Sequence, residues 1–497
     1  MIYSEESFDF VIIGGGTAGA NRNLDPKIQV PGSVTQLFRD VEYDWSFNTV
    51  PQESLNERAI NHPPGKVFGG SSATNAIGWN RDNMTRARLD IDYMDYKLYG
   101  KDGPIQTAIS NFTMPLTRLL GATLKNLGHK ATKDPISGEA VGAYSCPSFI
   151  DPRSATRSHA GVAYYDPVKS RPNLHLKENA LVEKIVLEKL TDGSVIATES
   201  TFGSPALLEL SGIGDPALLT SLGIDVVIPN LNVGENLQNH VMTTVTAEVL
   251  NPDDSLDSLG DPAKLATAIE AYTTHQTGPL SAGFSATSYL PPTPTPLPRL
   301  ANPIPPPRHH PPLPDRHPAL TQRRRRRDLP RLLPSGTNLI SLVPALMHPL
   351  SRGTVHITSA SPTVYPAINP NYLSHPLDLE LFARGLLYCS TVLAPQSLAA
   401  LLKEGGKGMP ERRLATLAEA RAYARERAGT MFHPCGTCAM MPREGGAVVG
   451  ERLVVHGARN LRVVDASVFP VIVKGPVTSS VFAVAERAAD LVRGELG

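Results

Sequence analysis

A glycine-rich turn near the start of the chain follows directly on a short apolar run. Residues 9–13 (Asp-Phe-Val-Ile-Ile) are rich in β-branched side chains, which is typical of a buried strand. The run continues into Gly14-Gly-Gly-Thr-Ala-Gly19, a G-x-G-x-x-G pattern. Its glycines permit a tight strand-to-helix turn and a close approach to a pyrophosphate, and the next helix directs free N–H groups at the phosphates. The stretch therefore predicts a dinucleotide site in an α/β fold.

The composition bounds the class of protein. The chain has 497 residues, enough for two or three domains, and equal numbers of basic and acidic side chains, 47 of each. The formal net charge of +0 argues against nucleic acid or an anionic membrane as the main partner. No apolar run approaches the length of about 18 residues that a membrane span needs. The acidic N-terminus lacks the basic region of a signal peptide, so we expect an intracellular, by default cytoplasmic, location.

The cysteines do not indicate a disulfide framework, since there are only four in a chain of this length. Cys435-Gly-Thr-Cys438 has the spacing of a redox pair or of half a zinc site. No second pair of cysteines or histidines at ligand spacing accompanies it. We therefore expect no metal site.

The chain lacks residues that a complete dinucleotide fold needs after its first turn. A βαβ crossover requires a helix of about ten residues and then a second strand. Pro26 and Pro31 stop a helix soon after Gly19, and residues 28–30 are too short for that strand. Asp40 has about the spacing of the acidic residue that holds the ribose hydroxyls, but without a preceding strand the spacing is a coincidence. The adenosine half of the site therefore lacks its usual support.

A second segment rich in glycine and hydroxyl groups, residues 65–81, can supply further donors to phosphates, although a plain glycine turn would look the same. Together with residues 14–19 it resembles the glucose-methanol-choline (GMC) family of FAD-dependent oxidoreductases, most of all the fungal aryl-alcohol-oxidase and secondary-metabolism branch. Further motifs follow in the family's order: DWSFNTVPQ (44–52), RPNLHL (171–176), GSPALLELSGIG (203–214), VGENLQNH (233–240), SRGTV (351–355), PNYL (370–373), HPCGTCAM (433–440) and LRVVDAS (461–467).

The resemblance implies a fold and its division. The class is α/β, with a Rossmann-like, discontinuous FAD-binding domain and an inserted substrate domain of the α+β kind, a sheet covered by helices. The FAD-binding domain would comprise residues 1–240, which include some substrate-domain segments, and residues 433–497. The substrate domain would be residues 241–432.

The resemblance also implies which residues hold FAD. The pyrophosphate would be cradled by Gly14, Gly16, Thr17, Ala18 and Gly19. The flavin and its phosphates would be lined by Val67, Gly69, Gly70, Ser71, Asn75, Ala76, Ile77 and Gly78. The adenine would meet the backbone of Val182, and the ribityl chain and pyrophosphate would meet Asp465 and Ala466. Val477 and Thr478 would lie beside the flavin ring.

Alcohol oxidation by a flavin needs a base that accepts the hydroxyl proton, and histidine suits because its pKa lies near the working pH. By the resemblance, His433 stands where the family has its catalytic base. The family's second active-site residue, His or Asn, is replaced here by Pro476, which has neither a polar side chain nor an N–H. Thr478 is the candidate to substitute for it. Loss of one such positioned group costs about 10²–10³ in rate.

Residues 291–334 differ abruptly in composition, because 15 of these 44 residues are proline and residues 323–327 are five consecutive arginines. Such a tract is typical of polyproline II and of disordered segments, and a nuclear-localisation or nucleic-acid patch is the alternative. Further on, apolar spacing predicts helices at 378–388, 414–427 and 482–492. We interpret His356 and His375 as structural or surface histidines.

Three functions fit this sequence. The first is an FAD-dependent oxidase or dehydrogenase of a small-molecule alcohol in fungal secondary metabolism, re-oxidised by oxygen or another electron acceptor. The second is a non-redox lyase or cyclase that keeps the flavin structurally and uses His433 for acid–base chemistry. The third is a degenerate, inactive family member, because several family segments are missing from the chain.

Overall fold

A computed structural model describes residues 8–16, 25–76, 97, 100, 102–108, 112, 114–129, 137, 142–145, 147–187, 194–197, 201–282, 286–290, 338–394 and 400–495. Five of the predicted site residues lie outside these ranges: Thr17, Ala18, Gly19, Ile77 and Gly78. The proline- and arginine-rich tract at 291–334 also lies outside them.

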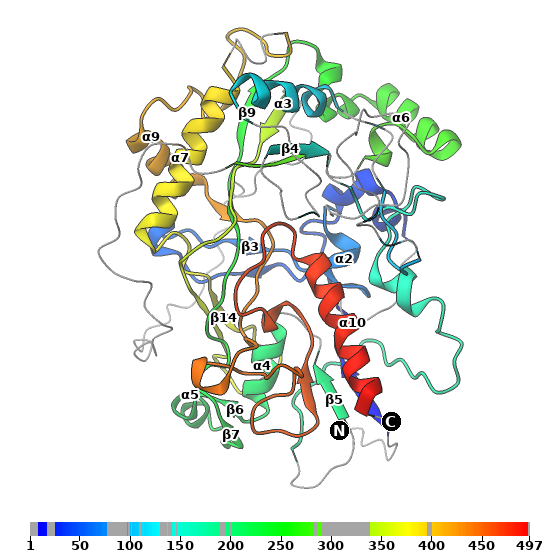
Figure 1. The fold of residues 1–497 in the computed structure, drawn as a ribbon, viewed down its shortest axis with the longest axis vertical. Coiled ribbons are helices and arrows are strands. Elements are labelled where there is room, and N and C mark those ends of the chain that lie inside the picture. Colours follow the sequence, from blue (N-terminus) through cyan, green and yellow to red (C-terminus); the bar gives the residue numbers. More distant parts are fainter. Residues whose placement is uncertain are drawn as a thin grey trace.

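A parallel sheet of three strands contains the predicted first strand. Its order is β1 (Phe10–Ile13), β5 (Ser194–Ala197) and β17 (Leu461–Val463), with β5 in the centre. The strands come from the beginning, the middle and the end of the chain. Figure 1 shows β5 in the lower half of the molecule, where α10 (Thr478–Glu495) also ends. The fold is thus mixed α/β.

The strand predicted at residues 9–13 is present, but the prediction that it is buried is wrong. Val11 is 42% exposed and Ile12 is 59% exposed, whereas Ile13 is buried. The cause is the edge position of β1, because within the described part of the chain β5 is its only partner. The next strand, β2 (Phe47–Asn48), pairs with β3 (Asn61–His62) instead.

The first helix described after the glycine turn, α1 (Pro26–Gln29), has only four residues. Asp25 caps it by accepting a hydrogen bond from the backbone N–H of Lys27, and Pro26 suits the first helical turn. Asp40 accepts a bond of 3.1 Å from Nζ of Lys27 and another from the N–H of Glu42. Asp40 is therefore part of a local ion pair and does not stand at the end of a second strand.

The largest group of buried apolar side chains joins segments that are far apart in the sequence. It unites Ile13 with residues between 185 and 233 and residues between 435 and 488. α4 (Gly203–Leu210), β17 and α10 each contribute side chains to it. Folding of this core therefore requires the early, middle and late parts of the chain together.

A second core lies under α7 (Pro376–Val392) and α9 (Leu417–Arg427), which Figure 1 places in the upper half of the molecule. These helices, with α10, confirm the three helices predicted from apolar spacing. Two antiparallel sheets belong to this region. Their orders are β11 (Leu339–Leu342), β9 (Val245–Glu248), β15 (Gly408–Met409) and β12 (Ala345–Leu346), β8 (Val241–Met242), β16 (Gly429–Thr430).

The remaining helices and strands are shorter or peripheral. The α-helices are α2 (Ser71–Thr74), α3 (Pro115–Asn126), α5 (Pro216–Ser221) and α6 (Pro262–His275). The strands are β4 (Gly142–Ser145), β6 (Ile213–Gly214), β7 (Ile228–Pro229), β10 (Ala286–Tyr289), β13 (Thr354–His356) and β14 (Ala367–Asn369). Within the ranges given above, no helix has the length and apolar character to cross a membrane.

Candidate active site

The structure brings the two glycine segments together. The N–H of Gly69 donates a hydrogen bond of 2.9 Å to the carbonyl oxygen of Gly15. Gly14, Gly69 and Gly70 have φ angles of 103°, 87° and 48°, which side chains rarely tolerate. A Cβ at Gly15 would stand only 3.0 Å from the Phe68 ring. The two turns therefore touch through backbone, which leaves little room for side chains between them.

Asn75 connects the second glycine segment to two other parts of the chain. Nη1 of Arg157 donates to the carbonyl oxygen of Asn75 (2.7 Å) and to its Oδ1 (3.1 Å). Nδ2 of Asn75 donates to Oγ1 of Thr478 at the start of α10 (3.3 Å). Ala76 follows Asn75 directly, and Ser71 begins α2. Residues predicted to line the flavin thus lie close together.

Asp465 stands just after β17 and is buried. Its carboxylate accepts bonds from Oγ of Ser204 (2.5 Å) and from the N–H of Ser467 (2.7 Å). Burial raises the pKa of Asp465, although these hydroxyl and amide donors act in the opposite direction. The carbonyl of Ala466 accepts a bond from the N–H of Gly436, which joins this turn to the His433 segment.

Three of the predicted cofactor contacts are valines that pack in apolar clusters. Val477 is buried in the large core, and the half-buried Val182 packs against the same core. Residues 181–187 form no strand, and Leu181 beside Val182 is 62% exposed. Val67 packs against a separate small cluster around Ile28.

His433 faces His240. Their Nδ1 atoms are 2.8 Å apart, and the rings meet edge to face with centroids 5.0 Å apart. Nε2 of His240 lies 3.0 Å from the carbonyl oxygen of Met347. Burial, the largest cause, lowers the pKa of His240 to about 4, although the carbonyls of Met347 and Val473 oppose it. Burial and the neighbouring His240 also lower the pKa of His433, so both rings are neutral at pH 7.

The backbone around His433 is held by a buried polar network. The N–H of His433 donates to Oδ1 of Asn239 (3.0 Å). Nδ2 of Asn239 donates in turn to the hydroxyls of Tyr372 (2.6 Å) and Thr430 (2.8 Å). Phe432 has a φ of 66°, a strained value for a bulky residue and one found at functional turns. The local backbone therefore fixes the direction in which His433 leaves the chain.

His240 was not among the residues singled out for catalysis in the sequence. It ended a recognised motif, VGENLQNH, but nothing in its neighbourhood indicates a contact with a residue 193 positions away. The pairing of β8 with β16 and the bridge between Gln238 and Cys435 bring the two rings together.

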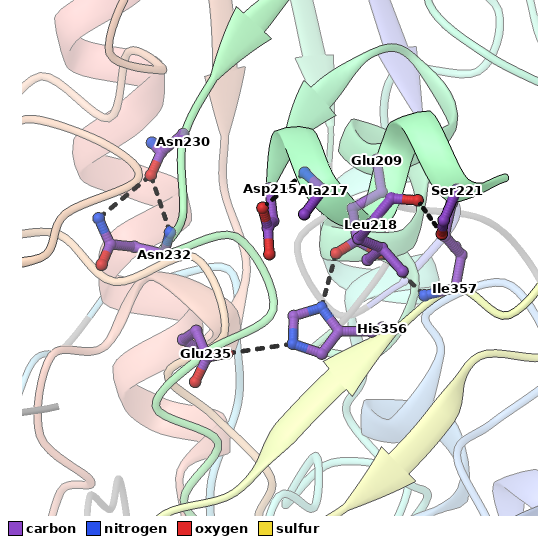
Figure 2. A network of polar contacts seen from close by, with 10 residues as sticks. All are labelled: Glu209, Asp215, Ala217, Leu218, Ser221, Asn230, Asn232, Glu235, His356 and Ile357. Carbon is purple, nitrogen blue, oxygen red and sulfur yellow. Dashed lines mark hydrogen bonds and ion pairs between the residues drawn. The ribbon is translucent and has the colours of Figure 1, made fainter. Parts of the chain in front are cut away.

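Figure 2 shows a second polar network, around His356. Its Nδ1 lies 2.7 Å from Oε1 of Glu209, and its Nε2 lies 3.2 Å from Oε1 of Glu235. Glu209 also accepts a bond from the N–H of Ile357 (2.8 Å). The network links α4, the turn at Glu235 and β13. It is an ion cluster, and no hydrogen bond joins it to His433 among the described residues.

Comparisons with known proteins decide the family. A family model described as GMC oxidoreductase matches residues 349–485. The dehydrogenase mpl7 of Monascus purpureus is 30% identical over 614 positions, which cover 100% of this chain and 97% of the relative. The GMC oxidoreductase family protein Mala s 12 of Malassezia sympodialis is 31% identical, over 98% of this chain and 93% of the relative. The chain belongs to the GMC oxidoreductase family.

The solved structures agree on the fold. An FAD-dependent oxidoreductase from Chaetomium thermophilum superposes with a TM-score of 0.82 at 23% identity, over 98% of this chain and 99% of that chain. GMC oxidoreductases are FAD-dependent and act on CH–OH groups. The resemblance found in the sequence is thereby confirmed. The alignment with the Monascus relative spans 614 positions against 497 residues here, so this GMC chain lacks segments that its relative has.

The residues present fit the flavin and pyrophosphate part of FAD. Three buried polar atoms near these segments have no hydrogen-bond partner among the described residues: Nη2 of Arg157, Nε2 of His159 and Oγ of Ser467. A Cβ at Gly69 would stand 3.0 Å from Nδ1 of His159, so the histidine lies against the glycine turn. Arg157 is 1% exposed and forms no ion pair with the described carboxylates. Unpaired donors and a cation beside glycine turns suit a pyrophosphate.

The adenosine half of FAD has no such support. In the described ranges β5 alone pairs with β1, and Asp40 is bound to Lys27. Among the described residues of this GMC member, we therefore find unpartnered polar groups near the segments for the flavin end, and no acidic side chain at the end of a second strand beside β1 for the ribose hydroxyls.

Pro476 and Thr478 lie at the start of α10. The hydroxyl of Thr478 accepts its bond from Asn75, and no bond joins Thr478 to His433 in the described part of the chain. Cys435 and Cys438 are buried free thiols, and burial raises the pKa of Cys435 to about 12. No group of three or more metal-binding side chains occurs among the residues described.

Proposed function

We propose that this GMC protein oxidises an alcohol, with His433 as the base that accepts the hydroxyl proton. The observation that carries the proposal is the state of His433. The ring is neutral at pH 7 and half-buried, and within the described residues only Nδ1 of the ring has a hydrogen-bond partner. A neutral imidazole with one nitrogen unengaged can accept a proton from a hydroxyl. FAD, when bound, supplies the acceptor for the hydride.

The proposed site draws its residues from several segments. The pyrophosphate would be held by the turn at Gly14–Gly16 and by Gly69 and Gly70, and the ribityl chain by Asp465 and Ala466. Val477, Thr478 and Asn75 would lie beside the flavin ring, with Val182 towards the adenine. The bond between Asn75 and Thr478 and the bond between Gly69 and Gly15 support this arrangement.

The division into domains is supported by two separate buried cores. We propose an FAD-binding domain of residues 1–240 and 433–497 and a substrate domain of residues 241–432. The large core, which unites early, middle and late residues, supports a discontinuous domain. The core under α7 and α9 supports a separate region for the substrate.

The proposed substrate is a small-molecule alcohol of fungal secondary metabolism. The relative from Monascus carries the name dehydrogenase, which favours an electron acceptor other than oxygen. Because Pro476 offers no hydrogen bond, we expect turnover to be about 10²–10³ slower than with a second polar group in place.

The test compares the purified protein with His433→Ala under anaerobic conditions. Released flavin is counted after denaturation, and a panel of aromatic and aliphatic alcohols is mixed with the protein while the flavin absorbance is followed. We expect near one FAD per chain in both proteins, and alcohol-driven bleaching that is about 10²–10⁴ slower in the variant. His456→Gln serves as the control, since the ring of His456 lies against the carbonyl of Met441 and, within the described residues, has no bond to the candidate site. Equal bleaching rates in the intact protein and in His433→Ala would reject the role of His433.

A further inference from the structure

Three short strands place His240 in contact with both Met347 and His433. β8 is the central strand, and it pairs with β12 on one side and with β16 on the other. His240 comes just before β8, and Met347 comes just after β12, opposite it. His433 follows β16 by three residues, and the N–H of Met431 donates to the carbonyl of His240 (2.9 Å).

The hydrogen-bond roles along this line follow from chemistry. A backbone carbonyl can only accept, so Nε2 of His240 must donate its proton to the oxygen of Met347. A neutral histidine has one N–H, so Nδ1 of His240 can only accept. The proton between the two rings must then belong to Nδ1 of His433. Nε2 of His433 is left with a lone pair and no proton.

We propose that His240 is a positioning residue: through the carbonyl of Met347 it fixes the tautomer of His433 with the proton on Nδ1 and the lone pair on Nε2. The proposal rests on the proposed role of His433 as a base. It goes beyond that role, because it names the residue that makes His433 an acceptor before any substrate arrives.

The neutral state of His240 supports this assignment. A protonated His240 would donate from both nitrogens and would reverse the roles in the pair. Burial opposes that state, and His240 is 0% exposed, with His348 adding a further unfavourable charge interaction. No carboxylate within the described residues bonds either ring, and the carbonyls of Met347 and Val473, which favour an imidazolium at His240, do not outweigh burial.

The direct test reads the tautomer by NMR of protein labelled with ¹⁵N at histidine, as the purified holoprotein without substrate. His433→Asn and His240→Asn assign the two sets of signals by their loss. We expect His433 to show a protonated Nδ1 and an unprotonated Nε2. A proton on Nε2 of His433 in the intact protein would overturn the proposal.

A matched pair of amide variants tests the consequence for reactivity. Asn at position 240 places its amide where Nδ1 was and can still accept from His433, whereas Gln reaches the carbonyl of Met347 instead. We expect His240→Gln and His240→Leu to slow alcohol-driven flavin reduction about 10²-fold or more, as wrong tautomers do in serine proteases. His240→Asn should stay within about tenfold of the intact protein. If His240 acted through packing alone, His240→Asn and His240→Gln would slow flavin reduction equally. That result would overturn the proposal.

Separate results would reject the proposed function and the proposed role of His240. If His433→Ala leaves flavin reduction unchanged, the base is another group and the proposed function falls. If His433→Ala slows the reaction but His433 keeps its tautomer in His240→Leu, only the role of His240 falls.

Discussion

At the residue scale, His356 contrasts with the neutral pair in the candidate site. Burial acts to lower its pKa, but the bonds and attraction of Glu209 and Glu235 outweigh burial and raise the pKa to about 10 (Figure 2). Glu209 is fully buried, and the side chain of His356 is 18% exposed. A buried carboxylate of this kind is tolerated because a charged partner faces it. The interpretation of His356 as a structural histidine agrees with this ion cluster.

Replacing His356 should show how much the ion cluster contributes to the free energy of unfolding. Because His356→Gln leaves Glu209 buried without its cation, we expect a loss of about 3–5 kcal/mol in the free energy of unfolding near neutral pH. The folded pKa of about 10 lies above the ordinary histidine value of 6.5, so this contribution is complete below pH 6.5 and disappears as the pH rises through 10. Urea unfolding of both proteins across this range measures it. A difference that does not change with pH would show that His356 is uncharged in the folded protein.

At the scale of single elements, β1 shows what a missing neighbour does to a strand. Its apolar run predicts burial on both faces, yet two of its side chains are exposed because its outer edge has no strand partner among the described residues. A matched pair of substitutions tests this. Ile12→Ala should change the free energy of unfolding by no more than about 0.5 kcal/mol, whereas Ile13→Ala should cost about 2–5 kcal/mol. Equal losses in thermal unfolding would mean that Ile12 is covered in solution.

The elements also show which parts of the fold a sequence can specify. α7, α9 and α10 were predictable because apolar spacing over three or more turns is a local property. The two-residue strands β8, β12 and β16 were not, since each exists only through its partner. The motifs of the candidate site could be recognised one by one, but the pairing of His240 with His433 depends on those strands. Likewise, the loss of the second strand was visible as a missing segment, while its effect on Val11 and Ile12 needed the sheet order.

At the scale of the whole molecule, the chain lacks the βαβ crossover that should follow Gly19. We therefore expect the flavin and pyrophosphate, rather than the adenosine, to provide most of the binding affinity for FAD. Only six residues separate Gly19 from Pro26, and the acidic side chain at a plausible spacing, Asp40, is held by Lys27. The unpartnered polar groups among the described residues lie at the flavin and pyrophosphate end, on Arg157, His159 and Ser467. A complete dinucleotide fold would add charged hydrogen bonds to the ribose hydroxyls from its second strand.

We therefore expect the flavin-free protein to bind FMN within about tenfold of its affinity for FAD, a difference of about 1.4 kcal/mol or less. Titration followed by flavin fluorescence gives both dissociation constants, and the rise in unfolding temperature at matched saturation gives an independent measure. Lys27→Ala is the control, because it frees Asp40 without touching the glycine turns. A preference for FAD over FMN of a hundredfold or more would mean that the chain holds the adenosine half by residues other than a second strand. A preference for FAD that appears only in Lys27→Ala would assign that role to Asp40.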